Sequence, residues 1–437
     1  MARIKIAYIG GGSSRAAGTM ASFVHHGEQF DGSEFVLIDV DPEHLELVRS
    51  MAEKMARAAG IDYTVTATTD QRAGLQDVDA VLTSFRPGNF AARVLDERIP
   101  LKHGVIGQET QGPGGMMMSL RSIHLYQGIV DDLLAVAPRA RIFNYTNPVN
   151  IVSQAVTRFT DIPIASFCEG PLTFPATAVR GAGLDPARLD ATMVGVNHNC
   201  WSVAATYDGQ DAIEVLRDRW ELVKDTPLPS DPTLRVERRI LELSVAMGSL
   251  AADYFQYYYF TDEILRELQM SRRTRAEFLL DHLPDYWAHY REQESLEQPA
   301  LDPARSRGGI HELELAIDAM NAFYNDTGER LPFNVPNAGK VMPDFDEDVV
   351  VEVWGAVDAS GFHPETFPSL PHAVRGLTQQ LAEYQYLAAD AAWRGTRKDA
   401  IRAMVANPLV PSLHVAEALY DEMAHAHRDY LPDRLLG

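Results

Sequence analysis

The stretch RIKIAYIGGGSSRAAGTMASFVHH, residues 3–26, decides the fold of the N-terminal part of this chain. An apolar run leads into three glycines and two serines, and a helical pattern follows. This order predicts a buried strand, a tight turn and a helix whose free N–H groups can bind an anionic group such as a dinucleotide pyrophosphate. Measured against G-x-G-x-x-G, Gly10 and Gly12 match, but Arg15 stands at the third glycine. Taken alone, the turn is equally consistent with a generic strand–helix connection.

An acidic residue at the end of the next predicted strand favours a nicotinamide cofactor. The segment 34–56, EFVLIDVDPEHLELVRSMAEKMA, predicts a strand followed by an amphipathic helix, and Asp39 lies 27 residues after Gly12. A carboxylate there can accept hydrogen bonds from the adenosine ribose, and it disfavours the extra phosphate of NADP. The alternative is that Asp39 only caps the helix. We predict NAD, bound by Gly10, Gly12, Ser13, Ser14 and Asp39.

Further strand–helix units follow before the pattern changes. Segments 79–89 and 140–156 predict buried strands that break into loops, and the second carries Asn147 and Asn150, which could bond a sugar or nicotinamide. In a doubly wound sheet, ligands bind at these carboxyl ends. We expect an α/β protein with a Rossmann-like NAD-binding domain, 1–200, and a mostly helical α+β domain for substrate binding and oligomerisation, 201–437. Long helical stretches are predicted at 213–224, 234–260, 272–296 and 374–404.

The composition excludes several classes of partner. With 437 residues, 46% hydrophobic and 23% charged, the chain suits a folded soluble protein of two domains. A net charge of −22 argues against nucleic acid and anionic membranes, and no apolar run approaches the ~20 residues of a membrane span. Two cysteines and no signal-peptide pattern predict a reducing, cytoplasmic location. An anionic substrate would therefore need a local cluster of arginines.

A cysteine and a histidine suggest a metal site. Cys168 and His198 each follow a strand-like run, within FCEGP and GVNHNCW. A thiolate and an imidazole on one rim could bind a divalent transition metal and leave positions open for substrate oxygens. Each residue alone is more often part of a core, so both interpretations stay open from spacing alone.

Five motifs in order resemble the NAD- and manganese-dependent glycosidases of glycoside hydrolase family 4. They are YIGGGSS, DERIPLKHGVIGQETQGPGG, NYTNPVNIVSQA, FCEGP and GVNHNCW, and the resemblance continues more loosely through SLAADYFQYYY, 249–259. The family is an exception to two-carboxylate glycoside hydrolysis. The resemblance implies transient oxidation of the sugar at C3, removal of the C2 proton, elimination at C1, addition of water and return of the hydride.

The resemblance also implies residue roles. Cys168 and His198 match the metal ligands, with manganese expected, and Tyr254 matches the base that removes the C2 proton. Asn147 matches a sugar-binding asparagine, Asn197 is expected to bind substrate beside His198, and Glu109 lies in a loop that approaches the metal. The alternative for Tyr254 is packing, because it lies in a tyrosine-rich stripe.

Two departures bear on the substrate. Glu169 follows the cysteine, as an acid does in α-selective relatives, where it is the proton donor to the leaving group; a supporting hydrogen bond is the alternative. LAADYF replaces the IPxxYL of phosphate-processing relatives. Arg93 matches an arginine near the C6 group, and Arg273 and Arg275, with Arg272, could complete an anion clamp or simply begin a helix. We therefore expect an anionic C6 group and favour α-sulfoquinovosides over 6-phospho-glucosides.

Two other functional classes compete with the glycosidase. A dehydrogenase of the lactate/malate type shares the fold and the NPV turn but needs no metal. An NAD-binding regulatory protein without turnover would not need Cys168, His198 and Tyr254 together. The predicted partners are a small anionic sugar glycoside and further copies of the chain, with no nucleic acid and no membrane.

Overall fold

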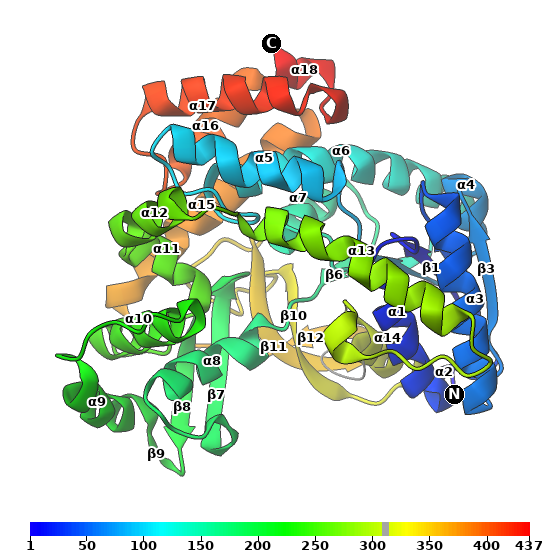
Figure 1. The fold of residues 1–437 in the computed structure, drawn as a ribbon, viewed down its shortest axis with the longest axis horizontal. Coiled ribbons are helices and arrows are strands. Elements are labelled where there is room, and N and C mark those ends of the chain that lie inside the picture. The colour runs from blue at the N-terminus through cyan, green and yellow to red at the C-terminus, as the bar shows by residue number, and fades with distance from the viewer. Residues whose placement is uncertain (308–313) are drawn as a thin grey trace.

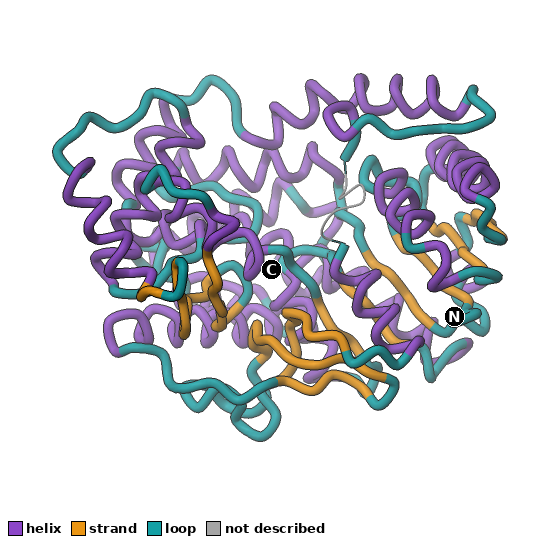
Figure 2. Tube along the Cα trace, turned by 90° about the horizontal axis from the view of Figure 1, so that it is seen from below, coloured by secondary structure: helices purple, strands orange, loops and turns teal. Residues whose placement is uncertain are grey.

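The computed structural model describes residues 1–307 and 314–437. Within them, twelve strands form one sheet in the order β3–β2–β1–β4–β5–β6–β10–β11–β7–β8–β9, with β12 paired to β11. Helices pack along the row of strands (Figure 1 and Figure 2). The strands are β1 (Lys5–Ile9), β2 (Glu34–Ile38), β3 (Thr64–Thr68), β4 (Ala80–Thr83), β5 (Arg141–Asn144), β6 (Ile164–Ser166), β7 (Leu189–Val196), β8 (Asn199–Tyr207), β9 (Gln210–Asp211), β10 (Glu329–Pro336), β11 (Val350–Asp358) and β12 (Gly361–Pro364).

The N-terminal half forms the predicted Rossmann-like sheet. Strands β1 to β6 are parallel and lie in the order 3-2-1-4-5-6, which is that of dinucleotide-binding folds. Between and after them lie α1 (Ala16–His25), α2 (Gly27–Phe30), α3 (Pro42–Ala59), α4 (Gln71–Gly74), α5 (Asn89–Lys102), α6 (Gly112–Val136), α7 (Val149–Phe159), α8 (Gly170–Gly181) and the 3₁₀ helix η1 (Pro186–Arg188).

The second half adds strands to the same sheet. The β10–β11 hairpin inserts between β6 and β7, and β10 runs antiparallel to β6. The predicted boundary at residue 200 lies inside β8, so the sheet continues across it, and the division into two domains stays a prediction. The remaining helices are α9 (Ala212–Val223), α10 (Pro232–Met247), η2 (Asp253–Phe255), α11 (Gln256–Tyr259), α12 (Thr261–Met270), α13 (Arg275–Glu294), η3 (Pro303–Arg305), α14 (Leu315–Asn325), α15 (His372–Arg394), α16 (Arg397–Ala406), α17 (Leu413–Ala426), η4 (Arg428–Tyr430) and α18 (Asp433–Leu436).

The helix predicted for 234–260 is wrong in its second part. Gly248 ends α10 with φ +72°, a left-handed conformation that glycine adopts without a steric penalty. The chain then runs beside β8, where Ser202 N donates to the carbonyl of Leu250 and Ala252 N donates to that of Cys200. This pairing carries η2, and with it Tyr254, toward the turn between β7 and β8.

Helix α13 joins the two halves of the molecule. It crosses from α5 to α3 in Figure 1, and it packs against both. Tyr290 donates a hydrogen bond from Oη to the Ser14 carbonyl at 2.8 Å, and Lys54 on α3 binds Glu294. Among the described residues, no helix has both the length and the apolar character needed to cross a membrane.

Candidate active site

The glycine turn closes against the end of β2. Gly10 has φ +95°, and a Cβ there would lie 2.2 Å from the Ser84 carbonyl oxygen, so only glycine fits. Gly12 N donates to Asp39 Oδ2 at 3.0 Å. The alternative that Asp39 caps the following helix is wrong, because Asp41 is the N-cap of α3. Asp39 therefore lies beside the glycine turn, where a cofactor-binding acid is expected.

The two predicted serines complete this turn. Ser13 N donates to the Gly10 carbonyl at 2.9 Å. Ser14 Oγ accepts a hydrogen bond from Arg307 Nη1 at 3.3 Å, and its carbonyl accepts the bond from Tyr290. Two hydrogen bonds thus fix the turn, one from Tyr290 on α13 and one from Arg307.

His198 and Tyr254 lie face to face. Their rings are parallel within 2°, with centroids 4.0 Å apart. His198 is in the turn between β7 and β8 with φ +66°, and the ring of Phe174 on α8 meets both rings edge-on. The ring of Tyr254 thus covers one face of the predicted metal ligand, and its role as the base stays a prediction.

The histidine is held in a form that can bind a cation. Thr110 Oγ1 lies 2.9 Å from His198 Nδ1, which leaves Nε2 as the free ring nitrogen. Burial lowers the pKa of His198 to about 4, although Glu109 opposes this shift, so the ring is neutral at pH 7. A neutral imidazole with one nitrogen held by a neighbour is the usual metal-binding form.

Cys168 lies two residues after the end of β6. Its Sγ accepts a hydrogen bond from Gly170 N at 3.4 Å. Burial raises the pKa of the thiol well above its usual value, and Glu352 and Glu169 add to this. A negative charge on Cys168 also raises the pKa of the Tyr254 phenol, after the larger effect of burial. A hydrogen bond with the side chain of Asn197, the residue before His198, acts in the opposite direction on the pKa of the Cys168 thiol and lowers it. A cation at this position would favour the thiolate.

Glu169 contacts Arg15, which follows the glycine turn. It is the N-cap residue of α8, and its Oε1 lies 3.6 Å from Arg15 Nη2. The same nitrogen lies 3.0 Å from Glu314, and the guanidinium covers the ring of Tyr145. Arg15, which replaces the third glycine of the turn, therefore links that turn to the residue that follows Cys168.

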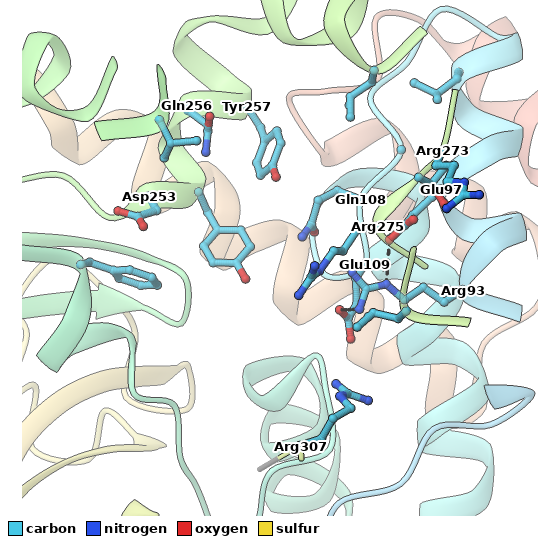
Figure 3. A pocket seen from close by; sticks show the side chains of 18 residues that line it. Arg93, Glu97, Gln108, Glu109, Asp253, Gln256, Tyr257, Arg273, Arg275 and Arg307 are labelled. Atoms are coloured by element: carbon cyan, nitrogen blue, oxygen red, sulfur yellow. Dashed lines mark hydrogen bonds and ion pairs between the residues drawn. The ribbon is translucent and has the colours of Figure 1, made fainter. Parts of the chain in front are cut away.

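A cavity of about 480 Å³ opens beside Tyr254. Figure 3 shows Asp253, Gln256 and Tyr257 on one side of it and Arg93, Gln108 and Glu109 on the other, with Arg307 apart from both groups. Cys168 and His198 do not line the cavity. Tyr254 lines it, and the ring of Tyr254 stacks on that of His198. The charged lining residues are Arg93, Arg273, Arg275, Arg307, Glu97, Glu109 and Asp253.

Glu109 is the centre of an ion-pair network in this cavity. It contacts both Arg86 and Arg93, and Arg93 Nε also binds Glu97 Oε1 at 2.7 Å. Burial opposes ionisation of Glu109, but the two arginines outweigh it and lower its pKa to about 2. Part of the charge of Arg93 is therefore already balanced within the protein.

The other predicted arginines differ in position. Arg273 and Arg275 are exposed and lie at the cavity edge at the start of α13, where Arg273 binds Asp281 at 2.7 Å. Arg272 is also exposed but is not among the lining residues. Arg307 is half-buried, and burial, with a smaller effect of Arg86, lowers its pKa to about 10.

The predicted asparagines do not line this cavity. Asn147 lies in the turn between β5 and α7, with its side chain half-buried. Asn197 is buried and donates from Nδ2 to Glu352 Oε1 at 2.8 Å. Asn150 donates to Gln385 instead. Substrate binding by Asn147 and Asn197 stays a prediction.

Sequence patterns did not indicate several residues of the site. Thr110 lies inside a quoted motif, but nothing there marks it as the partner of His198. Arg86 and Arg307 are isolated arginines in loops, and Glu352 is an acid inside an apolar strand. Their roles depend on residues tens to hundreds of positions away, so no local pattern reveals them.

Comparisons with known proteins show the family of this chain. A model of the family 4 glycosyl hydrolases matches residues 5–179, and a model of that family's C-terminal domain matches 193–410. A Bacillus subtilis (strain 168) protein named "Probable 6-phospho-beta-glucosidase" is 33% identical over 98% of this chain and 97% of its own.

A similar crystal structure is that of a 6-phospho-α-glucosidase from gut microorganisms, in complex with NAD and Mn²⁺. It has a TM-score of 0.85 and 25% identity, covering 98% of this chain and 99% of its own. A malate dehydrogenase from Plasmodium falciparum has a TM-score of 0.54 at 10% identity, covering 90% of this chain and 100% of its own, which is a likeness of fold alone. The two family models together span most of the sequence, so this chain is an enzyme that belongs to the family 4 glycosyl hydrolases.

Proposed function

We propose that this enzyme is a glycosidase that uses NAD and a divalent metal ion, manganese first, to cleave glycosides of a glucose-like sugar with an anionic group at C6. The observation that carries the proposal is the stacked His198–Tyr254 pair beside Cys168, next to an arginine-rich cavity. The named relatives act on 6-phospho-glucosides, so we take a 6-phospho-glucoside as the first substrate.

The residues present fit both cofactors. The turn has no room for a Cβ at Gly10, and Asp39 accepts a hydrogen bond from Gly12 N beside it, which suits a dinucleotide. No group of three or more His, Cys, Asp or Glu side chains suited to a metal occurs in 1–307 and 314–437, so Cys168 and His198 would share the ion with substrate oxygens. When bound, NAD supplies a reversible hydride acceptor and the metal supplies positive charge at the sugar hydroxyls.

The side chains then have distinct tasks. Tyr254 Oη would take the proton from the sugar C2, since its ring is fixed against His198. Glu169 would carry the proton of the leaving group, and its contact with Arg15 would hold it at the rim. Phe174 packs against both rings in a T-shaped arrangement.

The C6 group would meet the arginines. Four arginines and three acids line the cavity, a surplus of about one positive charge. This small surplus keeps a sulfonate monoanion as the second candidate. An α-sulfoquinovoside is therefore tested beside the phosphate.

In the experiment, purified protein and NAD are incubated with three substrates, each with and without Mn²⁺. The substrates are the nitrophenyl α- and β-6-phospho-glucosides and a nitrophenyl α-sulfoquinovoside. Nitrophenol release without accumulation of NADH is expected, since the hydride returns within each turnover. The substrate that is hydrolysed fastest identifies the preferred C6 group and the preferred anomer. NADH formed in proportion to substrate, with no nitrophenol, would contradict the proposal.

Replacing Asp39 with alanine is expected to weaken NAD binding about 10- to 100-fold, because charge-assisted bonds to the ribose contribute about 1.5–3 kcal/mol. The measurement is the NAD dissociation constant by calorimetry. Asp41→Ala is the matched control, since it removes the cap of α3 two residues away and should lower the melting temperature while leaving NAD affinity within about threefold. Equal NAD affinity in Asp39→Ala and wild type would remove Asp39 from the cofactor site.

Cytoplasmic location and assembly into homo-oligomers remain part of this proposal. The location rests on two free cysteines, one of them proposed to act as a thiolate.

A further inference from the structure

A row of buried polar side chains crosses the sheet at the edge where the site lies. Each residue of this row is paired, in the register of the sheet, with the next residue of the row on the neighbouring strand. All five are at most 1% exposed, although the surrounding strands are apolar. From β4 to β11 they are Thr83, Asn144, Ser166, Asn334 and Glu352.

Hydrogen bonds connect the row without a break. Thr83 Oγ1 donates to Asn144 Oδ1 at 2.9 Å, and Asn144 Nδ2 donates to Ser166 Oγ at 2.7 Å. Asn334 Nδ2 then donates to the Ser166 carbonyl at 3.2 Å and to Glu352 Oε1 at 3.1 Å. The row therefore ends on a buried carboxyl group.

Glu352 links the two segments that carry the predicted metal ligands. Through Asn334 it is joined to Ser166, and Cys168 follows two residues later. Through its bond from Asn197 Nδ2 it holds the turn that contains His198, the next residue. Strands β6 and β7 are not neighbours, because β10 and β11 lie between them. The distance between the two ligands therefore depends on this hairpin.

A purely structural role would not require a hydrogen-bond acceptor at this buried position. Burying an ionisable group in a core is costly, and a hydrophobic residue of similar volume is often as stable. Trp354 and Val350 on the same strand show that β11 accommodates apolar side chains. What the carboxyl group adds is an oxygen that accepts from both asparagines.

We propose that Glu352 is a positioning residue that sets the relative placement of Cys168 and His198 for the metal ion. The inference rests on the proposed metal-dependent function. Outer-shell partners of this kind typically change metal affinity by about 10- to 100-fold when removed.

The experiment titrates full-length protein with Co²⁺, a substitute for Mn²⁺, and follows the thiolate-to-cobalt absorption that reports Cys168. Mn²⁺ affinity is measured in parallel by the electron paramagnetic resonance of the free ion. We expect Glu352→Leu to weaken binding of both ions about 10- to 100-fold. Glu352→Gln keeps an acceptor oxygen and should bind within about threefold of wild type. Glu329→Gln, an exposed acid at the far end of β10, is the matched control and should not differ from wild type.

If Glu352→Leu fails to fold, Asn334→Ser tests the hydrogen bond between Asn334 and Glu352 by changing the donor instead of the acceptor. It removes one hydrogen bond to Glu352, and we expect Co²⁺ affinity to fall about 2- to 10-fold. Wild-type affinity in both Glu352→Leu and Asn334→Ser would overturn the inference, and so would a loss in Glu352→Gln as large as in Glu352→Leu. If the wild-type protein itself bound neither ion, the proposed metal-dependent function would fall instead.

Discussion

Cys168→Ser is expected to lower kcat/KM about 100- to 1000-fold and to abolish the response of activity to Mn²⁺. The physical reason is that a serine hydroxyl stays protonated and binds a divalent transition metal far more weakly than a thiolate, so positive charge is lost where negative charge develops on the sugar. The measurement is nitrophenol release as a function of Mn²⁺ concentration at saturating NAD.

Cys200→Ser provides the matched control for this result. Cys200 is the only other cysteine in the chain, and it is fully buried in β8. Its replacement should cost stability, seen as a lower melting temperature, while the Mn²⁺ response remains. Full activity with an unchanged Mn²⁺ response in Cys168→Ser would show that Cys168 is a core residue and that the metal is held elsewhere.

Tyr254→Phe is expected to lower kcat about 100- to 10,000-fold, which is the usual contribution of a positioned acid–base group. The phenylalanine ring can keep the stack on His198, so only the proton acceptor is removed. Burial raises the pKa of the Tyr254 phenol well above its usual value, and nearby negative charges, that of Cys168 first, add to this. A bound cation would act in the opposite direction and favour the phenolate.

The second measurement for Tyr254→Phe is exchange of the sugar C2 proton with solvent deuterium, read by NMR. Exchange should stop in this variant, while NAD affinity and melting temperature stay close to wild type. Tyr257→Phe is the control, because Tyr257 lines the same cavity without stacking on His198. Unchanged exchange in Tyr254→Phe would assign the proton transfer to another group.

Much of the fold follows from local patterns. The glycine turn and Asp39 are close in sequence to the strands that position them, and a parallel sheet brings the ends of neighbouring strands together. For this reason Gly10, Gly12 and Asp39 lie where the sequence predicted. The likeness of five motifs to one family likewise predicted membership of family 4, because their order and spacing are far more specific than any one of them.

The distant contacts could not be predicted in this way. Helix periodicity continues past Gly248 in the sequence, but the chain leaves α10 there because a left-handed residue and pairing with β8 are more favourable than another turn of helix. The SRRTR cluster was consistent with an anion clamp or with a helix start; Arg273 and Arg275 line the cavity, and so does Arg307, which no motif indicated. The sequence shows which side chains are charged, but the direction in which each side chain points depends on how the helices pack.

By itself, the amino-acid sequence determined the Rossmann-like half and the glycine turn after its first strand, because these depend on strand ends and glycine conformations within short segments. It predicted the pair Cys168 and His198 as metal ligands. Only the tertiary structure decided that Tyr254 stacks on His198, that Arg15 reaches Glu169, and that Glu352 joins the segments that carry Cys168 and His198. The β10–β11 hairpin inserts between β6 and β7 from more than 130 residues further along the chain. Packing of such distant segments is set by burial of the whole apolar surface, which no local pattern encodes.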